Sequence, residues 1–397
     1  MPACHTDTPL GATTRRAPVL ARSIHYRIDP GNRDARMRES AAWRWGPDAE
    51  AEGLRSGRAD VKAVALLEPR RFEIQDRPVP TPEPGEVLIR VAAVGICGSD
   101  LHAYHGNQPF VTYPRVLGHE LAGRIAGLGA GVVAFAMGDR VCVDLVINCG
   151  KCYPCRIGRP NCCVSIRVMG VHVDGGFAEY VTAPVGRVYK LPDELPDDQA
   201  AMVETLTIGC QAVARGEVAA GETVAVIGAG PIGLVAMLAA KARGAKVLVS
   251  DLLDRRLELA TSLGADAVVN SGRESLGDGV ARFTDGEGAN VVVEAVGAVA
   301  AVEAAIEVVS AAGRVVLLGL GSKPVPIIPT TLIRKELDVR ASRMNSRRFP
   351  EAIALAAKLT GPLGAMITHR LPLTSAPEAF SMLSASPESA CKVVLKP

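Results

Sequence analysis

A glycine pattern set between an apolar run and a helical segment constrains this chain more than any other feature. Residues 224–227 form the apolar run, and Gly228, Gly230 and Gly233 follow in the spacing G-x-G-x-x-G. The next strand-like segment ends in an acid, Asp251. A strand, a glycine turn, a helix and a second strand that ends in an acid together indicate a unit that binds a dinucleotide.

The residues of this unit predict how such a cofactor is held. Gly228 permits the tight turn, Gly230 lets the pyrophosphate approach the backbone, and Gly233 lets the helix pack on the sheet. Asp251 is expected to bind the adenosine ribose, which favours NAD because an anion there would repel the 2′-phosphate of NADP. Arg256 lies further along and partly offsets this preference. The expected cofactor-binding residues are Gly228, Gly230, Pro231, Ile232, Gly233, Asp251 and Arg256.

The alternation of strands and helices continues beyond the glycine pattern. Strand-like runs recur at residues 267–270, 290–294 and 314–319, with helical stretches between them. This alternation predicts an α/β fold with a doubly wound parallel sheet over residues 211–344.

The chain on either side of this sheet has a different pattern. Residues 61–210 combine glycines with alternating apolar and polar positions, as in a small antiparallel barrel, and residues 345–397 end in a run that we expect to return to it. Residues 1–60 hold many arginines and no lysine, without a sustained period. We expect them to be a disordered, dispensable extension. Their Trp43 and Trp45 leave open an oligomerisation arm as the alternative.

A second constellation of reactive side chains lies in the barrel segment. Cys97 and, after a loop, His119 and Glu120 offer a thiolate, an imidazole and a carboxylate. This is the mixed ligand set of a catalytic zinc ion that keeps one coordination position open. Ser99 and His102 add a hydroxyl and a second imidazole, as a proton path requires, and a plain surface histidine is the alternative for His102.

One glutamate further along is ambiguous. Glu204 follows the apolar pair Met202 and Val203 at the start of a helical stretch. It is either a satisfied helix carboxylate or a residue that faces the metal.

A cluster of cysteines indicates a second metal site of another kind. The cysteines follow the spacing C-x2-C-x2-C-x7-C, with Cys162 as a spare neighbour of the last. Four thiolates so close can surround zinc completely, which makes a structural site without an open position. A redox dithiol and unliganded surface thiols are the alternatives. The expected ligands are Cys149, Cys152, Cys155 and Cys163.

Composition excludes several classes of protein. The formal net charge is +2 and aromatic residues make up 4% of the chain, so we expect neither a nucleic-acid nor a membrane partner. No secretory signal opens the chain, and the most apolar run contains the glycine pattern. These absences lead us to expect a cytoplasmic protein that acts on a small molecule.

These motifs together resemble the zinc-dependent medium-chain dehydrogenases, the alcohol and polyol dehydrogenase superfamily. The resemblance covers residues 61–397 and implies a GroES-like β-barrel catalytic domain, residues 61–210, with a structural zinc lobe at 149–163. It also implies a Rossmann domain at 211–344 that binds NAD, two zinc ions per chain and a homo-oligomer, either a dimer or a tetramer.

The resemblance assigns roles to the reactive residues. Cys97 and His119 match ligands of the catalytic zinc, and Ser99 and His102 match a proton relay. The carboxylates Glu120 and Glu204 match positions that bind the zinc in polyol-type members or hold its water. The spacing seen in the family selects Cys163 rather than Cys162 for the structural zinc. Thr205 stands where polyol-type members have proline after the glutamate.

Two segments narrow the resemblance further. Residues 113–119 and 342–345 are most similar to bacterial sugar-acid dehydrogenases of the L-galactonate, L-gulonate or L-idonate kind, and to sorbitol-type enzymes. The resemblance implies oxidation of a secondary hydroxyl, with Arg343 and Asn345 binding the substrate. Alternatives are a threonine- or butanediol-type dehydrogenase and an NAD-sensing protein without turnover.

Overall fold

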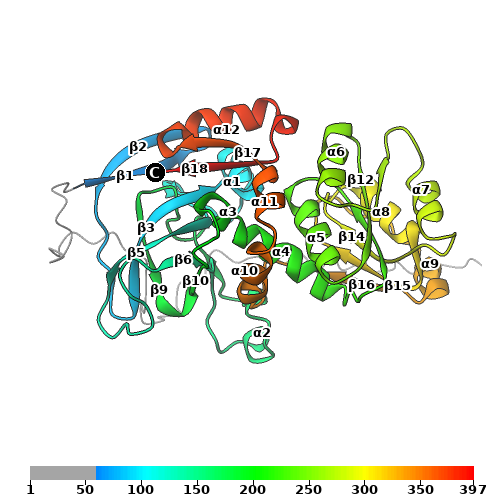
Figure 1. Cartoon of the computed structure of the whole chain (residues 1–397), viewed down its shortest axis with the longest axis horizontal. Coiled ribbons are helices and arrows are strands. Elements are labelled where there is room, and N and C mark those ends of the chain that lie inside the picture. Colours follow the sequence, from blue (N-terminus) through cyan, green and yellow to red (C-terminus); the bar gives the residue numbers. More distant parts are fainter. Residues whose placement is uncertain (1–59) are drawn as a thin grey trace, which may run out of the picture. The chain divides into compact units, whose positions relative to one another are not determined.

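The computed structural model describes residues 60–397 (Figure 1). The expectation of a disordered, dispensable extension therefore lies outside the described residues, except for Asp60, which begins the first strand. The described chain mixes helices with parallel and antiparallel sheets, which confirms the predicted α/β class. Among these residues, no helix is both long enough and apolar enough to span a membrane.

The barrel segment forms two main sheets and, around the cysteine lobe, a small two-stranded one. One has the strand order β2-β1-β4, and the larger one has seven strands in the order β10-β6-β5-β3-β18-β17, with β9 also paired to β3. Their pairs are antiparallel except β17 with β18. The strands are β1 Asp60–Glu68, β2 Arg71–Pro78, β3 Glu86–Gly95, β4 Arg115–Val116, β5 Glu120–Leu128, β6 Arg140–Val143, β9 Tyr180–Pro184, β10 Val188–Lys190, β17 Ile367–Pro372 and β18 Lys392–Lys396.

An apolar core holds these two sheets together. Leu66, Ile89 and Leu121 are almost fully buried, and Phe177 packs edge-on against Phe380. Short elements lie around this core, some of them in the cysteine lobe. They are α1 Gly98–Tyr104, β7 Val146–Ile147, α2 Tyr153–Arg156, η1 Pro160–Cys162, β8 Arg167–Val168, η2 Val185–Arg187, α3 Asp197–Ala200, η3 Leu373–Ser375, α12 Ala376–Ala385 and η4 Pro387–Ser389, where η marks a 3₁₀ helix.

The glycine pattern lies in a six-stranded parallel sheet with the order β13-β12-β11-β14-β15-β16. This is the strand order 3-2-1-4-5-6 of a doubly wound dinucleotide-binding sheet, which confirms the predicted architecture. The strands are β11 Thr223–Ile227, β12 Lys246–Asp251, β13 Ala267–Asn270, β14 Ala289–Glu294, β15 Val309–Leu317 and β16 Asp338–Ala341.

Helices cover both faces of this sheet. Val224 and Val226 of β11 join the core that includes α5, whereas Ala225 and Ile227 join the core that includes α7 and α8. Two buried faces explain why the strands read as continuous apolar runs. The helices that pack on its strands are α5 Pro231–Ala242, α6 Asp254–Ser262, α7 Leu276–Phe283, α8 Val299–Val308 and α9 Pro329–Lys335. Helix α4 Met202–Arg215 packs on α5, α10 Phe349–Ala356 packs on α4, and α11 Thr360–Met366 packs on α3 and β17.

The end of the chain returns to the barrel segment. After α10 and α11, the strands β17 and β18 add to the larger sheet, and β18 pairs with β3 through Val394 opposite Gly95. This pairing brings residues near the end of the chain beside the cysteine that follows β3.

Candidate active site

Strand pairing brings the predicted thiolate, imidazole and carboxylate together. Cys97 follows β3 as the residue that caps α1, and His119 directly precedes Glu120, the first residue of β5. Because Gly95 lies opposite Glu120 in the β3–β5 register, the ends of the two strands meet. One ligand atom from each of Cys97, His119 and Glu120 lies within 4.8 Å of the others.

Asp100, to which the sequence analysis gave no role, orients the histidine. Its carboxylate is buried, accepts the Cys97 N–H at 2.9 Å and lies 3.6 Å from Nδ1 of His119. Nδ1 has no hydrogen-bond partner among the described residues, so Asp100 acts on the ring through its charge, and the other nitrogen, Nε2, remains for a metal. Asp100 also accepts the N–H of Gly118, so it ties α1 to the segment that carries the histidine.

The charges around the histidine favour a cation. Burial alone lowers the pKa of His119, but the facing Asp100 and Cys97, with Glu204 further away, raise it well above its usual value. A metal ion at the same place would meet the same negative groups. The donor set and its electrostatics therefore fit zinc.

Glu120 has a buried partner that the sequence analysis missed. Lys392 of β18 approaches both carboxylate oxygens at 2.7 Å, and both side chains are almost fully buried. Burial raises the pKa of Glu120, but Lys392 and then His119 outweigh it and hold the pKa below its usual value. Gly95 leaves room for this carboxylate, because a Cβ there would lie 2.2 Å from Oε2. The available indication in the sequence was a lysine at the start of the last apolar run, Val393 to Leu395.

Glu204 lies near this group but outside the set of three. It is buried near the start of α4, and burial raises its pKa to about 8, partly countered by His119. A carboxyl group with such a pKa holds its proton at neutral pH unless a cation arrives. Glu120 and Glu204 are thus two buried carboxyl groups beside the same histidine, one paired with Lys392 and the other without an ion-pair partner among the described residues.

The two predicted proton-relay residues occupy the same short helix, α1. The Ser99 Oγ lies 3.4 Å from Nε2 of His119, so the hydroxyl reaches the metal position. His102 is exposed and lies three residues further along α1. Residues three apart share one face of a helix, so the two side chains form a step from the site towards solvent.

The four predicted cysteines also come together. Cys149, Cys152, Cys155 and Cys163 form a group with sulfur atoms within 4.8 Å of one another, and Cys162 is not part of it. Backbone hydrogen bonds lower the pKa of Cys152 to about 6, which favours a thiolate. Four thiol groups at these distances suit a tetrahedral zinc ion without an open position.

The glycine loop has the shape that a dinucleotide requires. Gly228 has φ of +100°, and a Cβ on Gly233 would lie 1.7 Å from the carbonyl oxygen of Gly228. At Gly230 a Cβ would meet open space, just before Pro231 and Ile232 begin α5. The N–H groups at this helix start can face a pyrophosphate.

The acid at the end of β12 lies against this loop. Asp251 accepts the N–H groups of Ala229 at 2.8 Å and Leu253 at 3.1 Å, and Arg256 approaches it at 3.5 Å. The predicted anion and its predicted cationic neighbour are thus in contact. A carboxylate held at this edge is placed as an acceptor for ribose hydroxyls.

The predicted substrate residues lie on the segment after β16. Arg343 is exposed, and its carbonyl oxygen accepts a 2.7 Å hydrogen bond from Asn161 in the cysteine lobe. Asn345 is buried beside Asp144, and its amide does not complete a hydrogen bond with any described residue. Met344 between them has φ of +48°, a costly conformation that clusters at functional sites.

The fold and the site define a zinc-type dehydrogenase built from two parts, and known families match each part. The family described as "Alcohol dehydrogenase GroES-like domain" matches residues 83–193, and the one described as "Zinc-binding dehydrogenase" matches residues 231–358. The chain belongs to the zinc-dependent medium-chain dehydrogenase/reductase family.

Individual relatives agree with this assignment. L-galactonate-5-dehydrogenase of Escherichia coli (strain K12) is 39% identical over 326 residues, which cover 81% of this chain and 94% of that protein. The crystal structure of a short chain alcohol dehydrogenase (rspB) from E. coli CFT073, complexed with NADH, has a TM-score of 0.80 and 38% sequence identity. The match covers 85% of this chain and 100% of that chain. The crystal structure of a putative zinc-binding dehydrogenase from Sinorhizobium meliloti 1021, bound to NADP, has a TM-score of 0.81 and 34% sequence identity, and the match covers 86% of this chain and 100% of that chain.

Proposed function

We propose that this protein oxidises a secondary hydroxyl of a sugar acid or a polyol by hydride transfer to NAD. The observation that carries the proposal is the meeting of Cys97, His119 and Glu120 within 4.8 Å, in a chain whose parallel sheet carries a dinucleotide-type loop. Zinc bound there would supply a Lewis acid that lowers the pKa of a hydroxyl, and NAD would supply the hydride acceptor.

The side chains of this site divide the work of holding the metal. Cys97 and His119 would bind it directly, and Glu120 or Glu204 would complete the set. Lys392 already neutralises Glu120, whereas burial leaves Glu204 with a pKa of about 8. A bound cation would therefore change the ionisation of Glu204 more than that of Glu120, because burial makes the charged form of Glu204 unfavourable until a cation is present.

The proton released from the substrate has a short route through α1. Ser99 would accept it, because its hydroxyl is 3.4 Å from the zinc-facing nitrogen of His119. His102 would then pass it to bulk water from its exposed position on the same helix face. Neither side chain has to leave α1 for this transfer.

The cofactor preference rests on the end of β12. Asp251 places a negative charge where NADP carries its 2′-phosphate, which supports NAD. Arg256 at 3.5 Å weakens that repulsion. We therefore expect a higher kcat/KM with NAD, and a residual rate with NADP.

The charge near Arg343 supports an acidic substrate. The pKa of His172 is lowered by burial and then by the cations of Arg115, Arg167 and Arg343 around it. The segment with His172 packs on the segment with the zinc-facing histidine, because Gly176 N–H donates to Gly118 O at 2.7 Å. A guanidinium can bind a carboxylate through two hydrogen bonds, so an acyclic sugar acid is our first choice and a neutral polyol the second.

The test is a panel of aldonates and neutral polyols, assayed with NAD and with NADP by the absorbance of the reduced cofactor. Arg343→Ala should reduce aldonate turnover by at least about tenfold and leave polyols nearly unchanged, since a charged hydrogen bond is lost only with the acid. Arg347→Ala removes an exposed arginine from the same segment and is the matched control.

Two results would count against this proposal. Equal losses on aldonates and polyols would show that Arg343 does not bind a carboxylate, and would favour the neutral polyol. No turnover of any alcohol by protein that contains zinc and binds NAD would favour the non-catalytic, NAD-sensing alternative.

A further inference from the structure

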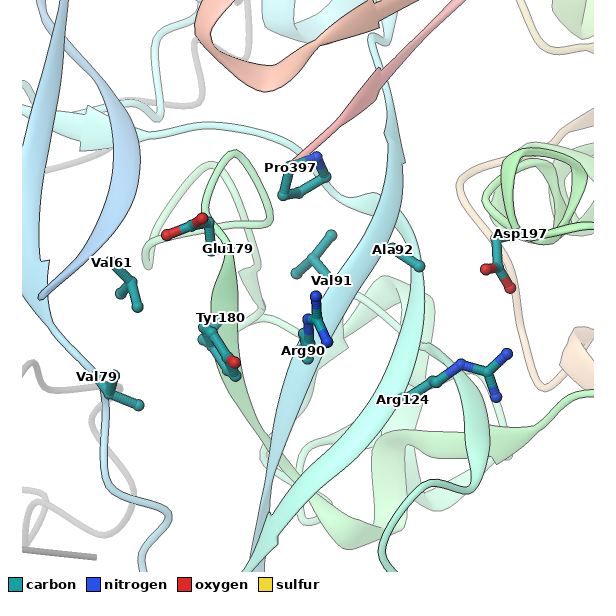
Figure 2. Close-up of a pocket in the computed structure, with 10 residues that line it drawn as sticks. All are labelled: Val61, Val79, Arg90, Val91, Ala92, Arg124, Glu179, Tyr180, Asp197 and Pro397. Atoms are coloured by element: carbon teal, nitrogen blue, oxygen red, sulfur yellow. The ribbon is translucent and has the colours of Figure 1, made fainter. Parts of the chain in front are cut away.

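A cavity of about 580 Å³ opens on the larger sheet of the barrel segment, apart from the residues of the candidate active site (Figure 2). Strands β1, β3, β5 and β9, helix α3 and the C-terminus contribute to its lining. Its volume lies within the range of about 300–1,000 Å³ that is usual for small-molecule sites. The lining residues are Val61, Val79, Arg90, Val91, Ala92, Arg124, Glu179, Tyr180, Asp197 and Pro397.

The cavity contains part of a row of arginines that crosses the sheet. Arg140 lies opposite Arg124, Arg124 lies opposite Arg90, and Arg90 lies opposite Tyr180 on four neighbouring strands. Residues directly opposite one another share a face, with Cβ atoms about 4.5–5.5 Å apart. Like charges in such positions destabilise a sheet unless negative groups compensate them.

The fold compensates only the first arginine of the row. Arg140 is buried and donates to the carbonyl oxygens of Pro192 and Asp193 at 2.6 and 2.9 Å, and it pairs with Asp197. The loop that supplies these acceptors ends at α3. Asp197 also lines the cavity, and it already has Arg140 as its partner.

The other two arginines have no such partner. The side chains of Arg90 and Arg124 are exposed, and within residues 60–397 neither guanidinium group forms a hydrogen bond or an ion pair. Glu179, another acid of the lining, accepts the N–H of Lys62 at 2.6 Å. Arg90 and Arg124 thus line the cavity from facing positions of β3 and β5, and neither side chain has an anionic partner among residues 60–397.

The geometry points to a binding site for a phosphate monoester with a flat apolar body. Arginine side chains at facing cross-strand positions can turn towards one phosphate, and each can donate two parallel hydrogen bonds to it. The double negative charge of the phosphate would neutralise the two positive charges. Tyr180 is in the same row, and its ring lies beside Arg90 (Figure 2). Val79, which is partly exposed, forms the apolar wall beside the rest of the ligand, whereas Val61 and Val91 are almost fully buried behind it.

The test uses the full-length protein with saturating NAD, so that the glycine loop is filled. Phenyl phosphate and inorganic phosphate are titrated calorimetrically at constant ionic strength. Phenyl phosphate should bind more tightly than inorganic phosphate, because only the ester reaches Tyr180 and the apolar wall. The double variant Arg90→Gln/Arg124→Gln should weaken phenyl phosphate at least about tenfold, since charged hydrogen bonds are lost.

Two further variants make the result specific. Arg71→Gln removes an exposed arginine that pairs with Glu68 elsewhere in the barrel segment, and it should bind phenyl phosphate as the unmodified protein does. Arg90→Lys/Arg124→Lys keeps both charges but loses the planar fork, and it should bind with intermediate affinity.

A second readout needs no ligand. Because Arg90 and Arg124 repel each other, Arg124→Gln should keep or raise Tm in low-salt buffer without phosphate, whereas Arg140→Gln should lower it. The inference is overturned if the unmodified protein does not bind phenyl phosphate, or if the double variant binds it equally well. In either case Arg90 and Arg124 are solvated surface cations.

Discussion

Single buried charges make the strongest demands on this fold. Glu120 and Lys392 are almost fully buried, and each lies where the other is the main compensating charge. A buried ion pair adds little net stability over an apolar pair, but removing one partner leaves a charge in an apolar environment. The pair is therefore a requirement of the site rather than a source of stability.

Lys392→Met should lower the free energy of unfolding by about 3–5 kcal/mol, because Glu120 stays buried without its partner. Chemical denaturation followed by circular dichroism measures the change. The double variant Glu120→Gln/Lys392→Met removes both charges and should recover much of the loss. If the double variant is as unstable as the single one, lost packing rather than the unpaired charge is the cause.

The residues of the site differ in how far the sequence could predict them. The glycine and cysteine patterns are short-range, so their spacing alone indicated a turn and a ligand set. Asp100 lies in the same segment as Cys97, but no local sequence pattern predicts that its carboxylate accepts a hydrogen bond from the N–H of Cys97. Lys392 is 272 positions from Glu120, and their contact depends on the register of β18 beside β3.

At the scale of elements, one carboxylate fastens α5 to the parallel sheet. Asp266, just before β13, accepts hydrogen bonds from Lys241 of α5 at 2.7 Å and from the N–H of Val247 in β12 at 2.6 Å. Burial raises the pKa of Asp266, but these two groups outweigh it and hold the pKa below its usual 3.8.

This depressed pKa gives stability a pH dependence of known sign. Asp266→Asn should cost about 1 kcal/mol at neutral pH, a modest value because Lys241 and Asp266 are partly exposed. The cost is fully present above the unfolded pKa near 4 and disappears as pH falls through the lower folded pKa. Urea unfolding between pH 3 and 7 measures it, with the exposed Asp278→Asn as control. A cost that persists unchanged at low pH would contradict the assignment.

The cysteine lobe should behave as a structural element. Cys152→Ser should remove one of two zinc ions per chain and lower Tm, with a smaller effect on turnover per zinc-loaded site, because a closed thiolate site is opened. Metal analysis and a thermal scan measure both quantities. Cys162→Ser is the matched control, since Cys162 lies beside Cys163 but outside the group of four. A protein with one zinc ion before mutation would contradict the two-site proposal.

Element boundaries were less predictable than element types. The sequence placed a strand at residues 314–319, whereas β15 runs over Val309–Leu317. Residues 310–313 read Ser-Ala-Ala-Gly, which carries little strand propensity, and only pairing with β14 across an irregular register makes them part of the strand. The later residues carry their own valine-rich pattern, so they were recognisable.

At the scale of the whole molecule, an exposed apolar segment supports the predicted homo-oligomer. Leu320, Ile328 and Ile333 are 89%, 67% and 75% exposed, and they precede β16, which is an edge strand of the parallel sheet. Several large exposed apolar side chains on the segment before an open strand edge are typical of a contact between copies.

Ile333→Glu should therefore shift the protein towards monomer, because a charge would be buried at the contact. Light scattering coupled to size exclusion measures the mass. The exposed Val133, at 94% in the barrel segment, gives the matched control Val133→Glu, which should leave the mass unchanged. A monomeric unmodified protein would remove the basis for this prediction.

The late position of Lys392 has a consequence for the order of events during synthesis. The ribosome must add 272 residues after Glu120 before the lysine exists, which takes roughly a quarter of a minute to a minute at ordinary translation rates. Throughout that time the nascent barrel segment lacks both its last strand and the cation for its buried acid. The parallel sheet, encoded entirely within the interval, can finish folding first, so the segment that is made earliest is completed last.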